Sequence, residues 1–262
     1  MQNLDQDDID NLSLLQDPSW PRYSNGLNDE DARTILLIKH NDEDTDQLVL
    51  EDVVFRAWSD TARLLGVFIG QNTNLMNLTI HNCNLDVVEL CDGLKHNRCI
   101  RQLRLSWVDL RDTTKLNSLA PFFIKNTSLE EIHLTSCNLW PYSIWFLSNA
   151  LSNLSGDTLK TLNLSGNNLG GDDLNILISV LITSCRGLTS LMLNNNEISL
   201  KGGRSLAKLL ESPEPNLQCL YLHNNSLNDK CAGILVDALA SNSNSKLKYL
   251  NLLGNSNIGS RL

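Results

Sequence analysis

Histidine and cysteine are the residues of this chain whose chemistry best suits metal binding or catalysis, and neither type is arranged for it. The sequence has five histidines and seven cysteines. No two cysteines stand in a CxxC pair, and the patterns HExxH, GxSxG, GxGxxG and GxxxxGK[ST] do not occur. His81 and His133 fall two strands apart in the arrangement predicted below, about 10 Å at ~4.8 Å per strand, which is too far to share a metal ion. We therefore predict a non-catalytic chain with no cofactor and no metal site.

Acidic residues are concentrated at the start of the chain. Residues 1–60 hold 15 acids and four bases, a net charge of −11, whereas the remaining 202 residues hold 15 acids and 17 bases, a net charge of +2. Nucleic acids and anionic membranes attract basic surfaces, so we predict neither as a partner. We expect residues 1–30 to form an acidic, partly disordered extension; the alternative is an arm that docks onto a basic partner.

The number of cysteines and the first residues of the chain both indicate in which cellular compartment the protein is located. Seven cysteines in a chain long enough to form its own core are expected to be reduced thiols. The first residues lack the basic and apolar regions of a secretory signal, and no run of eighteen apolar residues is present. These features predict a cytoplasmic location.

The pattern L-x-x-L-x-L-x-x-N/C-x-L recurs along the chain, with any aliphatic residue allowed in the leucine slots. Copies start at residues 75, 100, 129, 159, 188, 217 and 247, and a degenerate copy starts at residue 45. The spacings are therefore 30, 25, 29, 30, 29, 29 and 30 residues. A period of this length is typical of a solenoid, in which stacked units share a core that no single unit buries alone.

Each slot of the pattern has a structural role. The L-x-L part predicts a short strand with its leucines inward and the residues between them outward. The N/C slot falls where the chain turns away from the strand, and a buried side chain there can bond backbone groups that the turn leaves unpaired. The residues predicted to form this turn ladder are Cys83, Cys137, Asn167, Asn196, Asn225 and Asn255. Between the strands, apolar stripes at helical spacing predict helices, and we expect Gly203 and Gly233 to let helices approach their neighbours.

The seven clear copies resemble the leucine-rich repeat proteins, and their length and helical segments resemble the ribonuclease-inhibitor-like subclass. The resemblance covers residues 45–258. It implies an α/β leucine-rich repeat solenoid, a horseshoe with parallel strands on the concave face and helices on the convex face. We divide the chain into an N-terminal extension (1–30), an N-terminal cap with the degenerate repeat (31–74) and seven repeats of which the last is incomplete (75–262).

Some segments depart from the pattern. The 25-residue spacing predicts a short helix within residues 86–97, and Pro121 is expected to interrupt the next helix. The apolar run within residues 32–39 predicts a further strand that caps the array. The sequence stops after its last strand without a polar cap, which favours self-association or a partner at this end, or a chain that is a piece of something longer.

The outward strand positions are where we expect a partner to bind, because rigid rows of side chains lose little entropy on binding. Aromatic residues and arginine are the usual hot-spot types of interfaces. On this basis the candidate partner-binding residues are Arg104, Trp107, His133, Met192, Tyr221, His223 and Tyr249. The alternative is that each is an isolated exposed side chain. Trp140, Tyr142 and Trp145 lie beyond a strand and are expected to pack on the convex side.

Together these features predict an intracellular, non-catalytic scaffold that binds a partner protein along its concave face. Members of the leucine-rich repeat superfamily are mostly protein-recognition modules, so the resemblance implies the same role. The alternative is a regulator of a small GTPase, as some similar proteins are. Such relatives carry a long acidic tail after the repeats, whereas here the acidic segment precedes them.

Overall fold

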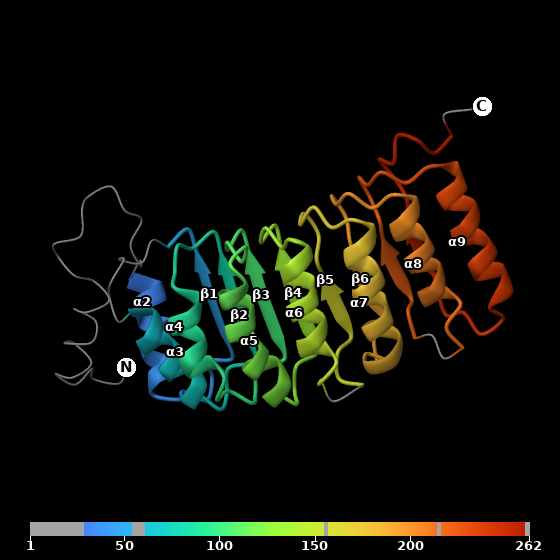
Figure 1. Cartoon of the computed structure of the whole chain (residues 1–262). Helices are drawn as coiled ribbons and strands as arrows, with labels where there is room; N and C mark the ends of the chain where they lie inside the picture. Colours follow the sequence, from blue (N-terminus) through green and yellow to red (C-terminus); the bar gives the residue numbers. More distant parts are fainter. Residues whose placement is uncertain (1–28, 54–60, 155–156, 214–215, 260–262) are drawn as a thin grey trace.

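The computed structural model describes residues 29–53, 61–154, 157–213 and 216–259, so most of the predicted acidic extension lies outside the described residues. Strands and helices alternate along the chain (Figure 1). The helices are α2 (Asp29–Lys39), α3 (Thr61–Gln71), α4 (Val87–Leu94), α5 (Thr113–Lys125), α6 (Pro141–Leu151), α7 (Gly171–Ser184), α8 (Leu200–Leu210) and α9 (Asp229–Ser241). The strands are β1 (Gln47–Glu51), β2 (Asn77–His81), β3 (Gln102–Ser106), β4 (Glu131–Thr135), β5 (Thr161–Asn163), β6 (Ser190–Met192), β7 (Cys219–Tyr221) and β8 (Tyr249–Asn251).

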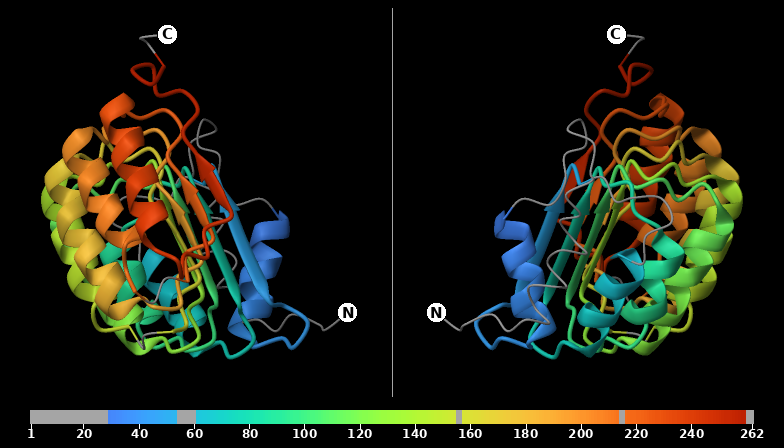
Figure 2. Two further views of the ribbon diagram at one scale, coloured as in Figure 1. Left: turned by 90° about the vertical axis from the view of Figure 1, so that its right-hand side faces the viewer. Right: turned by 90° about the vertical axis from the view of Figure 1, so that its left-hand side faces the viewer.

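These strands form one parallel sheet whose order is the order of the sequence, β1 to β8. The register keeps each leucine slot opposite the same slot of the next repeat, so that Leu78 pairs with Leu103 and Leu103 with Ile132. Helices α3 to α9 cover one face of the sheet and leave the other face open, and α2 lies beside β1 at the N-terminal end (Figure 2). The predicted α/β solenoid is therefore confirmed, and we call the open, concave face the strand face.

The core lies between the sheet and the helices. Leu78, Leu103 and Ile132 point into it from the successive strands β2, β3 and β4, and none has any exposed area. Burying a leucine side chain contributes about 2 kcal/mol, and here the burial depends on the repeats on both sides. Outward side chains are thus held on a backbone that the core keeps rigid.

The prediction of a strand over residues 32–39 is wrong, because this segment belongs to helix α2. Ile35 and Ile38 are buried within it, three positions apart, which places both on one side of a helix. A short apolar run fits a strand or a buried helix, so its periodicity alone does not decide. α2 packs against α3 and β1, and Leu48 and Leu50 of β1 are almost fully buried. The N-terminal end of the sheet is therefore covered.

Two predictions about the helices had different outcomes. α4, in the 25-residue repeat, has only eight residues, so the predicted short helix is confirmed. α5 is not interrupted by Pro121, contrary to the prediction, and runs unbroken over 13 residues. Pro121 removes the N–H that would bond the carbonyl of Asn117. Asn117 is an exposed residue, so its carbonyl is free to bond to water and the helix continues.

Of the two glycines expected to permit close helix approach, only Gly203 does so. A Cβ on Gly203 would lie 3.0 Å from Sγ of Cys231 in α9, whereas a Cβ on Gly233 would meet nothing within 4 Å. A tighter approach joins α3 to α4, where a Cβ on Gly66 would lie 2.2 Å from the carbonyl oxygen of Leu90. Gly233 faces open space because no further helix packs beyond α9 in the described residues.

The N/C slot forms a ladder of buried side chains behind the strand ends. Asn167 has no exposed area, and its Nδ2 donates to the carbonyls of Leu134 and Leu164 at 2.6 and 3.0 Å. Its Oδ1 accepts from the backbone N–H groups of Cys137 and Leu139 at 2.9 and 3.2 Å. One amide thus pairs backbone groups of two successive repeats, which fixes the turn that follows each strand.

The other members of the ladder also form hydrogen bonds to backbone groups of the preceding repeat. The side-chain amides of Asn196, Asn225 and Asn255 donate to carbonyls just beyond the ends of β5, β6 and β7, and they accept from N–H groups of the preceding repeat. Cys83 and Cys137 donate their thiols to carbonyls, at 3.5 Å to Leu50 and 3.3 Å to Leu105. All seven cysteines of the chain are free thiols.

Candidate functional site

The strand face presents the outward residues of eight strands, and its chemistry changes along the sheet. The centre, over β3 to β5, is polar and includes Arg104 and His133. The C-terminal part, over β6 to β8, carries Met192, Tyr221 and Tyr249. The predicted binding residues therefore fall into two separate groups, with Trp107 at the edge of the first.

A single carboxylate organises the polar centre. Three donors converge on Oε2 of Glu131: Gln102 Nε2, Arg104 Nη2 at 3.2 Å and His133 Nε2 at 3.1 Å. Desolvation raises the pKa of Glu131, but the hydrogen bonds from His133 and Gln102 outweigh it and the pKa is lowered. The carboxylate is therefore charged at neutral pH, and it fixes the direction of Arg104. Sequence reasoning missed Glu131 and Gln102, although both occupy the outward position two residues before a predicted binding residue.

His133 lies on the strand face, as predicted, but it is buried rather than exposed. Its Nδ1 lies 3.4 Å from Nδ2 of Asn163, whose Oδ1 accepts from the N–H of Ser165 at 3.0 Å. Burial lowers the pKa of His133; the hydrogen bond to Glu131 opposes this shift and the charge of Arg104 adds to it. The ring is neutral, with Nε2–H donating to Glu131 and Nδ1 accepting from Asn163. His133 therefore orients its neighbours and offers little surface of its own to a partner.

Trp107 follows β3 directly, at the carboxyl edge of the sheet, and it is 64% exposed. Its backbone is left-handed, with φ of 58°. The equivalent turn position has positive φ in every repeat, and the residues there are Asp52, Asn82, Trp107, Ser136, Gly166, Asn195, Asn224 and Gly254. This conformation costs most L-residues about 1–2 kcal/mol, whereas glycine, asparagine and aspartate tolerate it. Trp107 is the one bulky residue of the eight, so the turn does not account for its presence.

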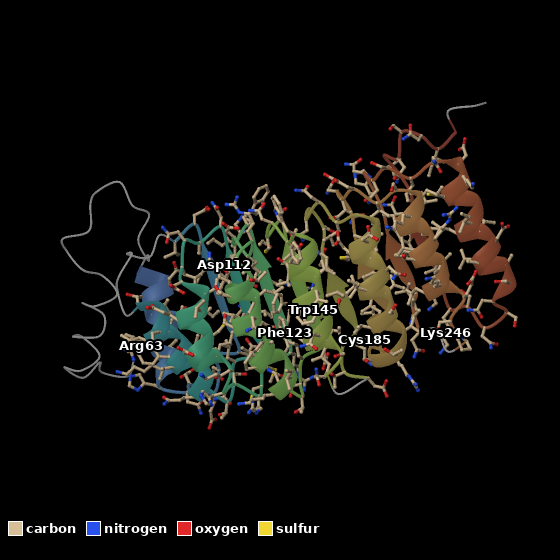
Figure 3. The ribbon with its side chains drawn as sticks, in the orientation of Figure 1. Arg63, Asp112, Phe123, Trp145, Cys185 and Lys246 are labelled. Atoms are coloured by element: carbon tan, nitrogen blue, oxygen red, sulfur yellow. The ribbon has the colours of Figure 1, made fainter. Side chains whose placement is uncertain are left out.

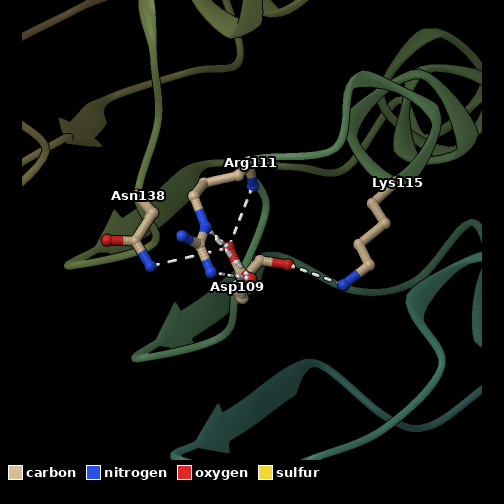
Figure 4. A network of polar contacts seen from close by, with 4 residues as sticks. All are labelled: Asp109, Arg111, Lys115 and Asn138. Atoms are coloured by element: carbon tan, nitrogen blue, oxygen red, sulfur yellow. Dashed lines mark hydrogen bonds and ion pairs between the residues drawn. The ribbon is translucent and has the colours of Figure 1, made fainter.

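The loop that follows Trp107 is held by a polar network (Figure 4). Asp109 accepts from Arg111 through both carboxylate oxygens, at 3.0 Å from Nε and 2.9 Å from Nη2, and also from the Arg111 backbone N–H at 3.1 Å and from Nδ2 of Asn138 at 3.5 Å. Lys115 donates to the carbonyl oxygen of Asp109 at 3.0 Å. The hydrogen bond from Arg111 lowers the pKa of Asp109 to about 2. These contacts tie the loops after β3 and β4 together and support the backbone beside Trp107.

The aromatic part of the strand face is formed by two tyrosines whose rings are in contact at an interplanar angle of 45°. The ring centroids of Tyr221 and Tyr249 are 5.0 Å apart, and Met192 pairs with Tyr221 in the sheet register. Tyr249 is exposed and Leu253, beyond the end of β8, is 71% exposed. His223 is half-buried, and its Nδ1 has no hydrogen-bond partner among the described residues. This group therefore combines apolar area with polar atoms, as interfaces do.

The aromatic residues after β4 lie on the helix side, as predicted, but they are more exposed than packing there would require. Trp145 projects from α6 (Figure 3) and is 54% exposed. Its ring meets the edge of Phe146 at a centroid distance of 4.9 Å. Trp140 and Tyr142 are also exposed. Trp145, on α6, serves below as a comparison for Trp107.

The part of the chain that the structure describes contains no cluster of three or more histidine, cysteine or acidic side chains able to hold a metal ion. In the same residues no helix is both long and apolar enough to cross a membrane.

Comparisons with known proteins place the chain among repeat proteins. No protein-family model matches it. It is 31% identical over 191 residues to NACHT, LRR and PYD domains-containing protein 5 of Mus musculus, covering 72% of this chain and 16% of that protein. The protein of the same name from Homo sapiens is 30% identical over 185 residues, covering 69% of this chain and 15% of that protein. The chain thus spans about a sixth of the length of these curated relatives.

Among solved structures, internalin C2 from Listeria monocytogenes is similar in part. It has 21% sequence identity and a TM-score of 0.47, and the match covers 80% of this chain and 72% of that one.

Proposed function

This chain is a leucine-rich repeat protein, and on that premise we propose that it is an intracellular scaffold that binds a partner protein along its strand face. The observation that carries the proposal is Trp107. An exposed tryptophan in a left-handed turn lowers the stability of the fold, while seven repeats place small or turn-forming residues at the same position. Tryptophan is also one of the residue types that most often anchor protein interfaces.

The surroundings of Trp107 support an anchor for a protein partner. Arg104 is fixed by Glu131 at 3.2 Å, and the loop after Trp107 is fixed by the contacts of Asp109. Side chains held before binding lose little entropy when a partner arrives. The tilted aromatic pair of Tyr221 and Tyr249 extends the same face toward β8. A partner that lies along the strand face would contact the polar centre over β3 to β5 and the aromatic part over β6 to β8.

Affinity capture with a matched pair of variants tests this proposal. We expect Trp107→Asn, which suits a left-handed turn, to reduce recovery of the partner at least tenfold, because a buried aromatic anchor contributes about 2 kcal/mol or more. Trp145→Asn is the control, since Trp145 is similarly exposed but lies on α6 on the helix side. Equal recovery of the partner by Trp107→Asn and the wild type would contradict the proposal.

The alternative, regulation of a small GTPase, rests on the family resemblance alone. Turnover of GTP by candidate GTPases, measured with and without the protein, tests it. The free thiol state of all seven cysteines supports a cytoplasmic setting for the proposed interaction.

A further inference from the structure

Two exposed tryptophans occupy positions where the local structure favours small polar residues. Trp107 lies in the left-handed turn after β3. Trp140 is the N-cap of α6, forms no side-chain cap hydrogen bond and is 59% exposed. Serine, threonine, aspartate and asparagine are preferred at N-caps, because their side chains accept from the first N–H groups of the helix. Neither tryptophan is therefore explained by the turn or the helix start that it occupies.

Each tryptophan follows acidic residues at the equivalent positions of the preceding repeats. The turn positions after β1, β2 and β3 hold Asp52, Asn82 and Trp107. The N-caps of α4, α5 and α6 are Asp86, Asp112 and Trp140. We call these six residues the tryptophan edge. At ~4.8 Å per strand, the backbone of Asp52 lies about 10 Å from that of Trp107 along this edge.

The carboxylates of the tryptophan edge form no ion pair with a lysine or arginine among the described residues. Asp52 accepts from Nδ2 of Asn82 at 2.6 Å. Asp86 and Asp112 accept from backbone N–H groups of the helices that they cap. The hydrogen bond from the Thr114 N–H lowers the pKa of Asp112, so this carboxylate is charged at neutral pH. Each of the three carboxylates thus keeps a negative charge that no base in the described residues pairs with.

The arginines near Trp107, in contrast, are paired within the protein. Arg104 pairs with Glu131 at 3.2 Å, and Arg111 pairs with Asp109 at 2.9 Å. The described loops that follow β1 to β4 hold four acids and one base, whereas those that follow β5 to β7 hold one acid and no base. Negative charge is therefore concentrated in the repeats that carry the two exposed tryptophans.

We propose that the tryptophan edge binds an arginine-containing, basic segment of the partner protein. This inference rests on the strand-face proposal and deepens it, because Trp107 belongs to both surfaces. Tryptophan is the aromatic side chain that attracts cations most strongly, and a guanidinium group stacks on its ring. Arginine also binds a carboxylate through two parallel N–H groups. An uncharged apolar segment would instead desolvate the carboxylates without pairing them.

The spacing along the edge predicts the spacing of the arginines. Two residues three positions apart in an extended segment are separated by about 10 Å. This matches the distance between the backbones of Asp52 and Trp107, so one arginine can stack on Trp107 while the other binds Asp52. Tryptophan and carboxylate then act on the same segment.

An NMR titration of the full chain with a tetra-arginine peptide, acetylated and amidated at its ends, tests this proposal. The indole N–H signal of Trp107 is assigned by its absence from Trp107→Asn, and we expect it to shift until the protein is saturated. The indole signal of Trp145 should not move. A tetra-lysine peptide has the same charge but no planar group to stack on the indole, so it should bind at least about threefold more weakly.

The triple variant Asp52→Asn, Asp86→Asn and Asp112→Asn tests the role of the carboxylates. Asparagine suits both the left-handed turn and the N-cap, so this variant should fold, which circular dichroism and thermal unfolding check. We expect it to raise the dissociation constant of tetra-arginine at least about tenfold, because three charges next to the cation are lost.

The matched control removes three charges from exposed positions elsewhere, with Asp157→Asn, Glu211→Gln and Asp237→Asn. It should change the dissociation constant by less than about threefold. Equal affinity of the two triple variants overturns the proposal, and so does a Trp107 indole signal that tetra-arginine leaves unchanged. Capture of the partner separates the two proposals: if Trp107→Asn loses the partner while the Asp52, Asp86 and Asp112 variant retains it, the strand-face proposal stands and the basic segment is refuted.

Discussion

Replacement of Asn167 by alanine measures what the turn ladder contributes to the fold. Its side chain is fully buried, donates to two carbonyls at 3.0 Å or less and accepts from the N–H groups of Cys137 and Leu139. Alanine leaves those two N–H groups without a partner, and an unsatisfied buried group costs about 1–3 kcal/mol. We therefore expect Asn167→Ala to lower the free energy of unfolding by about 4 kcal/mol.

Urea unfolding followed by circular dichroism measures this loss as a shift of the midpoint at constant slope. Asn149→Ala is the control, because Asn149 is exposed on α6 and alanine is the better helix former, so its stability should not fall. Asn167→Asp keeps the acceptor but loses both donors, and it should be no more stable than Asn167→Ala. A loss below about 1 kcal/mol for Asn167→Ala would refute the reasoning, since water would then replace the amide at little cost.

Two further predictions concern a close helix contact and an exposed ion pair. Gly66→Ala should destabilise the protein by at least about 2 kcal/mol, because the added Cβ would lie 2.2 Å from the Leu90 carbonyl oxygen. Gly233→Ala should stabilise it by about 0.5–1 kcal/mol, because a Cβ there would meet nothing within 4 Å. Thermal unfolding of the two variants measures the sign of each change. The pKa of Asp109 is about 2, below its usual 3.8, so its contribution is present above pH 4 and is lost as the pH falls toward 2. The Arg111 and Asp109 side chains are 60% and 44% exposed, so solvent screening keeps this contribution small, and Arg111→Ala should raise the pKa of Asp109 in an NMR titration.

The repeat period predicted the fold because one spacing sets strand, turn and helix together. Once the leucine slots are aligned, the inward residues and the turn positions follow from geometry, and Leu103 and Asn167 lie where the pattern requires. Residues 32–39 precede the first copy, so no slot could assign them, and a helix formed where a strand was predicted. Pro121 shows a similar limit, because its effect depends on whether the carbonyl it leaves unpaired is exposed.

The sequence predicted where the strand face lies more accurately than which side chains are exposed on it. Alternation places His133 outward, but burial depends on the neighbouring strands, and Glu131 and Asn163 cover its ring. The sequence could have indicated that Gln102 and Glu131 contact Arg104 and His133. Each precedes one of these residues by two positions and therefore lies on the same side of the sheet. The left-handed backbone of Trp107 was also implied, because asparagine, aspartate and glycine fill most equivalent positions.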